Sequence, residues 1–160
     1  MIWTDFERAA PGLARAVRAR FEATRIGLLG TIRADGSPRI SPIEPYFTSD
    51  DLLLGVMARS LKARDLARDP RCVLHSPVSH PDAGEPEFKL YGTAVEVAHA
   101  SAQEAPANAW WLTHPADVAR VFTLNIAEAS WIAWRLDQGE MTVVRWSERS
   151  GLKEVTRSYP

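Results

Sequence analysis

Hydrophobic and polar residues alternate over short segments through most of the chain, a pattern typical of β-strands. Turn-forming residues separate these segments, and the pair Asp35-Gly36 favours a tight hairpin. The pattern predicts about seven strands in all. Five lie in RIGLLGTIR, PRISPIEPYF, DLLLGVMA, RCVLHSPV and FKLYGTAVEVA, and the last two or three lie in RVFTLNI, SWIAWRLD and EMTVVRW. Because hairpins join most of them, we expect a mainly β fold, an antiparallel barrel with peripheral helices.

The first segment has helical rather than strand periodicity. Thr4 and Glu7 have the spacing of a capping box, and Pro11 can interrupt or restart a helix because proline is tolerated in a first turn. Apolar residues recur three or four positions apart, at Phe6, Ala10, Leu13, Val17 and Phe21. We therefore expect an N-terminal helix over about residues 4–20.

Prolines shape the segments that follow. Pro38, Pro42 and Pro45 fall within one predicted strand and have no N–H to donate, so this strand should be irregular or have an unpaired edge. The segment SLKARDLARDP reads as a helix that stops before Pro70. The Ala-rich stretch 101–120 contains further prolines and is predicted to form one or two short helices.

Composition limits the possible partners. With 160 residues, 46% of them hydrophobic, the chain should form one domain over residues 1–160. Nineteen basic and twenty acidic residues give a net charge of −1, which argues against nucleic acid or a membrane surface as partner. The single Cys72 excludes an internal disulfide, and the start of the chain lacks the apolar run of a signal peptide. A cytoplasmic protein is expected, and the preference for Arg over Lys hints at a bacterial source.

A cluster of cations surrounds the start of the second predicted helix, in GVMARSLKARDLARDP. The helix dipole disfavours a cation in the first turn by roughly 0.3–1 kcal/mol, so these side chains either point into water or bind an anion. Ser60 is a good N-cap, and Lys62 follows in the first turn beside free N–H groups. Arg59 and Arg64 can add donors suited to phosphate.

The aromatic, histidine and cysteine residues give weaker indications. Among six tryptophans, Trp110 and Trp111 lie in a proline-flanked segment and are the candidates to reach a pocket, whereas the others suit core or interface packing. Cys72 is expected to be a small buried residue rather than a nucleophile. No metal-binding spacing relates the four histidines, which are His75, His80, His99 and His114.

One stretch resembles a known family. The segment GTIRADGSPRISPI, followed by SLKARDLARDPRCVL, is similar to the pyridoxamine 5'-phosphate oxidase-like proteins, which are FMN-binding split β-barrels. The most specific part is Ser60, Lys62, Leu66 and Asp69-Pro70, and the similarity covers roughly residues 20–135. It implies a homodimer with two cofactors in the subunit interface and a flavin that moves hydride to or from a small organic substrate.

The resemblance also implies where the cofactor binds. Ser60 and Lys62 would hold its phosphate, the strand from Arg39 would lie along the isoalloxazine ring, and the end of the strand at Val56 would flank the ribityl chain. Alternation predicts Arg39, Ser41 and Ile43 on one strand face, with Ile40 and Pro42 on the other. No catalytic side chain and no metal ligand is assigned. The expected cofactor-binding residues are Arg39, Ile40, Ser41, Pro42, Val56, Met57, Ala58, Arg59, Ser60, Lys62 and Arg64.

Three departures from the family pattern leave other functions open on the same fold. Leu61 stands where many members have Arg, Glu87 where the biosynthetic oxidases use Gln, and Arg135-Leu136-Asp137 where they carry Arg-Leu-His. Synthesis of pyridoxal phosphate itself is therefore not expected. The alternatives are a reductase that uses the deazaflavin coenzyme F-420, a non-catalytic flavin or heme carrier or sensor, and a barrel that acts without cofactor as an interaction module.

Overall fold

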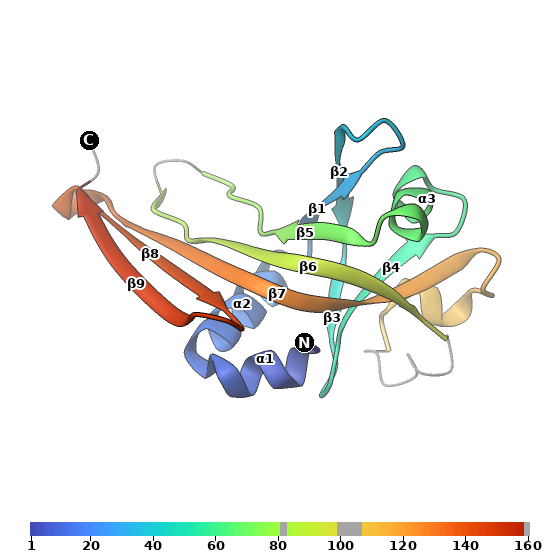
Figure 1. The fold of residues 1–160 in the computed structure, drawn as a ribbon, viewed down its shortest axis with the longest axis horizontal. Coiled ribbons are helices and arrows are strands. Elements are labelled where there is room, and N and C mark those ends of the chain that lie inside the picture. The colour runs from blue at the N-terminus through green and yellow to red at the C-terminus, as the bar shows by residue number, and fades with distance from the viewer. Residues whose placement is uncertain (81–82, 99–106, 159–160) are drawn as a thin grey trace.

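The computed structural model describes residues 1–80, 83–98 and 107–158 (Figure 1). Its strands form one sheet of nine, in the order β2-β1-β5-β6-β7-β4-β3, with β8 paired to β7 and β9 to β8. All the pairings are antiparallel, which confirms the predicted mainly β fold. The elements are α1 (Trp3–Ala9), α2 (Pro11–Thr24), β1 (Gly27–Ile32), β2 (Pro38–Ile43), β3 (Pro45–Phe47), β4 (Leu52–Met57), α3 (Leu61–Arg68), β5 (Arg71–His75), β6 (Glu87–Val97), η3 (Trp110–Thr113), β7 (Ala119–Arg135), η4 (Leu136–Gln138), β8 (Glu140–Ser147) and β9 (Gly151–Ser158).

The N-terminal region consists of two helices rather than one. Pro11 occupies the first position of α2, so the predicted restart is confirmed. The predicted capping box is wrong, because α1 has Ile2 as its N-cap and no side-chain cap bond. Tertiary contacts set this end instead: the Met1 ammonium donates to the carbonyl of Ile126 at 2.8 Å, and Trp3 is fully buried.

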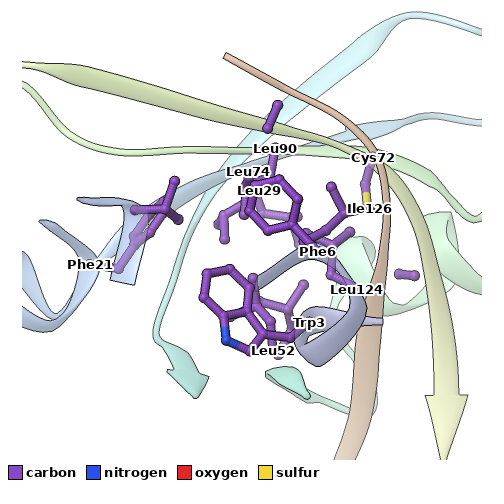
Figure 2. Packing of buried hydrophobic residues seen from close by; sticks show 14 of the residues in the cluster. Trp3, Phe6, Phe21, Leu29, Leu52, Cys72, Leu74, Leu90, Leu124 and Ile126 are labelled. Carbon is purple, nitrogen blue, oxygen red and sulfur yellow. The ribbon is translucent and has the colours of Figure 1, made fainter. Parts of the chain in front are cut away.

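The core lies between the two N-terminal helices and the sheet (Figure 2). Trp3 packs edge-on against Phe47, and Phe6 packs edge-on against Trp146 from β8. Cys72 is a buried free thiol at the rim of this core, as expected for a small apolar residue. The other labelled members come from several strands, and they are Leu29, Leu52, Leu74, Leu90, Leu124 and Ile126.

The sheet is held together by β7, a strand of 17 residues for which sequence patterns predicted two strands. Residues 127–129 separate the two predicted segments, and within them Ala127 is the extra residue of a bulge: Tyr91 faces Glu128 while Gly92 faces Ile126. A Cβ on Gly92 would lie 1.9 Å from the carbonyl oxygen of Asn125, so this close approach requires glycine. Sequence patterns do not indicate β9, because this strand has no buried face.

The predicted strand over residues 38–47 divides at Glu44 into β2 and β3, which lie at the two ends of the strand path. The prediction that this strand is irregular or has an unpaired edge is confirmed. Of the helices predicted in the stretch 101–120, residues 101–106 lie outside the described residues, and the remainder contains the short turn η3. None of the helices in the described part of the chain is long and apolar enough to cross a membrane.

Candidate cofactor site

The start of α3 has the predicted cap. β4 ends at Met57, and after a short turn the Ser60 hydroxyl accepts a hydrogen bond from the backbone N–H of Ala63 at 3.2 Å. The helix begins at Leu61, which places Lys62 in its first turn. N–H groups of a first turn have no partner within the helix, so this end offers donors to an anion.

Lys62 links this helix to strand β2. Its ammonium donates to the carbonyl oxygen of Pro42 at 2.6 Å. Desolvation by partial burial lowers the pKa of Lys62 below its ordinary value. An ammonium carries three donor hydrogens, so a single carbonyl leaves capacity for a further acceptor. A bound anion would favour the charged form and oppose the effect of burial.

A cavity of about 510 Å³ opens between β2, β4 and η3, beside Lys62. This size falls within the range of small-molecule sites. Its walls are mostly apolar, with Lys62, Glu44 and His114 as the ionisable groups, and the complete lining is Ile26, Pro42, Ile43, Glu44, Gly55, Val56, Met57, Lys62, Trp110, His114 and Val118.

Asp65, one turn after Lys62, fixes the orientation of α3. Its buried carboxylate accepts hydrogen bonds from Arg39 Nε at 2.6 Å, from Thr31 Oγ1 at 3.0 Å and from Arg68 Nη2 at 3.3 Å. Burial alone would raise the pKa of Asp65, but these hydrogen bonds outweigh burial and hold the pKa below its usual value. The network joins α3 to β1 and β2, and so sets the position from which Lys62 reaches the cavity.

Gly55 in β4 fixes the opposite wall. A Cβ at this position would lie 2.0 Å from the ring of Trp111, so the indole can pack against the strand only because the residue is glycine. Trp111 is fully buried, and its neighbour Trp110 lines the cavity. Of the two tryptophans proposed to reach a pocket, Trp110 therefore does so and Trp111 belongs to a core cluster.

The expected binding residues divide into two groups. Pro42, Val56, Met57 and Lys62 line the cavity. The alternation predicted for β2 is confirmed, because Arg39, Ser41 and Ile43 are more buried than their neighbours. Seven expected residues lie outside the lining: Arg39 binds Asp65, Ile40 is 72% exposed, Ser60 caps α3, Arg59 and Arg64 are exposed, and Ser41 and Ala58 are half-buried.

Several lining residues were missed from the sequence. Val118 reaches the cavity because its carbonyl accepts from the backbone N–H of Ala58 at 2.8 Å, a long-range contact with no local signal. His114 Nδ1 lies 2.8 Å from the carbonyl oxygen of Trp110. A carbonyl only accepts, so Nδ1 donates, and Nε2 of the neutral ring is left as an acceptor. Glycine within the apolar run LLLGVM was the one available signal, and it indicates close packing.

A second cavity, of about 680 Å³, adjoins the first and shares Ile26, Glu44 and Trp110 with it. At the junction, the Tyr46 hydroxyl donates to the Glu44 carboxylate at 2.7 Å. Burial and this contact with an anion raise the pKa of Tyr46 to about 12. No group of three or more His, Cys, Asp or Glu side chains in the described residues is arranged to hold a metal ion.

The fold is that of an antiparallel β-barrel protein, and a cavity of small-molecule size lies beside the start of helix α3. The family model of pyridoxamine 5'-phosphate oxidase matches residues 13–130, and the chain belongs to this family. No curated protein matches the chain significantly.

Solved structures share the fold. PhzG from Burkholderia lata 383, in complex with tetrahydrophenazine-1-carboxylic acid, is 14% identical with a TM-score of 0.65, over 95% of this chain and 96% of that one. A pyridoxamine 5'-phosphate oxidase-related, FMN-binding protein from Nostoc punctiforme is 12% identical with a TM-score of 0.61, over 94% and 96%. A heme-binding protein from Mycobacterium smegmatis is 17% identical with a TM-score of 0.59, over 90% and 88%. At these identities the similarity establishes the fold.

Proposed function

We propose that the protein is an FMN-dependent oxidoreductase that transfers hydride to or from a small organic substrate. The observation that carries this proposal is the half-buried Lys62 ammonium, which lies beside the first turn of α3 and on the wall of a mostly apolar cavity. A phosphate needs cationic and N–H donors at one end of the site, and a flavin ring needs apolar walls at the other. The named FMN-binding relative from Nostoc punctiforme supports this assignment.

The residues present fit such a cofactor. Lys62 and the first N–H groups of α3 would hold the phosphate, and Pro42, Val56 and Met57 would contact the ring system and exclude water from it. Bound FMN supplies the hydride chemistry, so the protein contributes placement and electrostatics and needs no side-chain nucleophile. Arg39 acts indirectly here, because its contact with Asp65 holds β2 against α3.

Heme binding is the second candidate, and His114 is the observation that favours it. Its ring lines the same cavity and leaves Nε2 as an acceptor, the atom through which a histidine ligates heme iron. Two proteins of the same fold, from Mycobacterium smegmatis and Vibrio cholerae, are described as heme-binding and heme-storage proteins. On this alternative the protein would be a carrier or sensor.

A titration of the cofactor-free protein against FMN, FAD, coenzyme F-420 and heme separates these candidates. The proposal predicts that FMN binds most tightly and that NAD(P)H or another hydride donor bleaches the bound flavin. Preferred binding of F-420 would change the cofactor, while a Soret band that His114→Ala abolishes would establish the heme alternative. Failure to bind any of the four would contradict both candidates and favour an interaction module.

We also propose that two copies associate through the outer face of β1, β2 and β6. Leu28, Ile40 and Val95 are exposed apolar side chains on this face, and Ile40 is the most exposed of them. Light scattering should give a dimer for the wild type and a monomer for Ile40→Glu. Leu152→Glu, an equally drastic change at an exposed position of β9, should remain dimeric. The proposed interface would be contradicted if both variants were monomeric, or if Ile40→Glu remained dimeric.

A further inference from the structure

A row of basic side chains crosses the outer face of the sheet at its other end. In the strand register Lys89 lies opposite Ser130, Ser130 opposite Arg145, and Arg145 opposite Lys153, so one row passes through β6, β7, β8 and β9. All four residues line a concave groove of about 580 Å³, together with Arg157 from the end of β9. The groove is separate from the cavity at α3 and shares no lining residue with it.

The charges in this row are unusual for neighbouring strands. Arg145 and Lys153 are directly opposite each other, an arrangement of like charges that destabilises a strand pair. Within the described part of the chain, Arg145, Lys153 and Arg157 form no ion pair. Other cations on the sheet do have acidic partners: Arg120 pairs with Glu96 from the neighbouring strand, and Lys89 with Glu87 at 2.5 Å.

An apolar band lies beside the cationic row. Ile132 faces Val143 and Val143 faces Val155, which gives a parallel row of aliphatic side chains two residues along each strand. All three line the groove. Alternation places the two rows on the same face, so a ligand in the groove would meet cations on one side and hydrocarbon on the other.

These features limit the ligand. The volume suits a small molecule, and the flanking apolar band suits one with a hydrophobic body. Glu128 also lines the groove, and the chain carries a net charge of −1, both of which disfavour an extended polyanion such as nucleic acid. The charge complementarity is to one or two anionic groups near Arg145 and Lys153.

We propose that this groove is a binding site for a small organic anion with an apolar body, such as an aromatic carboxylate. Arg145 and Lys153 contact the anionic group, and Ile132, Val143 and Val155 contact the body. A bound anion relieves the repulsion between the two cations, so binding also stabilises the pairing of β8 with β9. The site uses none of the residues assigned to the flavin, and either assignment can fail without the other.

The test is a titration of the full chain with 2-naphthoate, followed by backbone amide NMR shifts. The shifts should be concentrated at Ser130, Arg145 and Lys153. The neutral isostere 2-naphthamide should bind at least fivefold more weakly, and Arg145→Gln and Lys153→Gln should each lower the naphthoate affinity roughly fivefold, the upper range for one exposed ion pair. Arg149→Gln removes the same charge from the turn between β8 and β9, outside the groove lining, and should change the affinity less than twofold.

Three results would overturn the proposal. The first is equal affinity for naphthoate and naphthamide, which would show that the cations make no contact with the anionic group. The second is an equal loss in Arg149→Gln, which would indicate only a general charge effect. The third is a set of shifts that cluster around Lys62 instead of β7, β8 and β9. The amide comparison uses the unchanged protein, so it remains valid if a variant fails to fold.

Discussion

The charged side chains near α3 and those at the β8–β9 end of the sheet differ in their burial and in their partners. Near α3, the carboxylate of Asp65 is buried and receives hydrogen bonds from Arg39, Thr31 and Arg68. At the β8–β9 end, Arg145 and Lys153 are exposed and face each other. The first group forms a closed internal network, whereas the second leaves its charges available.

Burial explains this difference. A buried charge is stable only with partners inside the protein, so charges near the core must be satisfied by the fold itself. Exposed charges keep their hydration and can remain unpaired. Lys62 lies between the two cases, because it is half-buried and its ammonium donates to a carbonyl. Lys62 and the exposed row therefore have donors available to an external ligand, whereas the Nε–H of Arg39 is already bonded to Asp65.

Removal of the charge on Asp65 should have the largest effect. Asp65→Asn leaves Arg39 without its ionic partner, and we expect a loss of roughly 3 kcal/mol in the free energy of unfolding, measured with urea. Asp69→Asn is the matched control, because Asp69 pairs with Arg71 at the surface, and it should cost less than about 1 kcal/mol. An equal loss of unfolding free energy in the two variants would show that the buried Asp65 contacts contribute no more than a surface ion pair.

The same network predicts a dependence on pH. The pKa of Asp65 is below its usual value, so its contribution to stability is complete above the unfolded-state pKa of about 4 and is lost as the pH falls through the lowered native pKa. The difference in unfolding free energy between wild type and Asp65→Asn should therefore be constant near neutral pH and shrink below about pH 4. A difference that grows in acid would have the wrong sign for this account.

Gly55→Ala should have an intermediate effect. The added methyl group meets the buried ring of Trp111 and should destabilise the fold by about 1–3 kcal/mol, as overpacking does. It should also weaken flavin binding, because Trp110 follows the displaced residue. Thermal unfolding measures the first effect and a flavin titration the second. Gly12→Ala, where the added methyl group meets no atom within 4 Å, should leave both unchanged or slightly raise stability.

The smallest effect is expected on β9. Val155→Ala removes an exposed side chain and should change the unfolding free energy by about 0.5 kcal/mol or less. Val144→Ala, at a buried position on the neighbouring strand, should cost about 2 kcal/mol. Similar losses for the two valines would show that the outer face of the hairpin is covered in solution, which would favour a partner there.

Local signals predicted much of this arrangement. Ser60 as an N-cap, the end of α3 before Pro70, the Asp35-Gly36 turn and the alternation around Arg39 depend on adjacent residues, and the structure has all of them. Leu61, which marks a departure from the family pattern, is exposed at the start of α3 and adds no charged donor there.

The features that sequence patterns missed depend on distant residues. The partner of Arg39 is Asp65, which lies 26 positions away, so alternation placed the Arg39 side chain correctly but could not name its contact. The continuity of β7 depends on a bulge that is visible only in its pairing with β6. His114 reaches the cavity because η3 packs on Gly55, and Val118 reaches it because its carbonyl accepts from the N–H of Ala58. Nothing in the sequence around either residue indicates these contacts.

The most direct test of the proposed cofactor site compares FMN with riboflavin, which lacks the phosphate, by flavin fluorescence in wild type and Lys62→Gln. We expect FMN to bind the wild type at least about tenfold more tightly than riboflavin, and Lys62→Gln to remove most of this preference while riboflavin affinity is kept. Arg15→Gln, at an exposed position on α2, should behave as wild type. Equal binding of FMN and riboflavin by the wild type, or an unchanged preference in Lys62→Gln, would contradict the assignment of the phosphate to the start of α3.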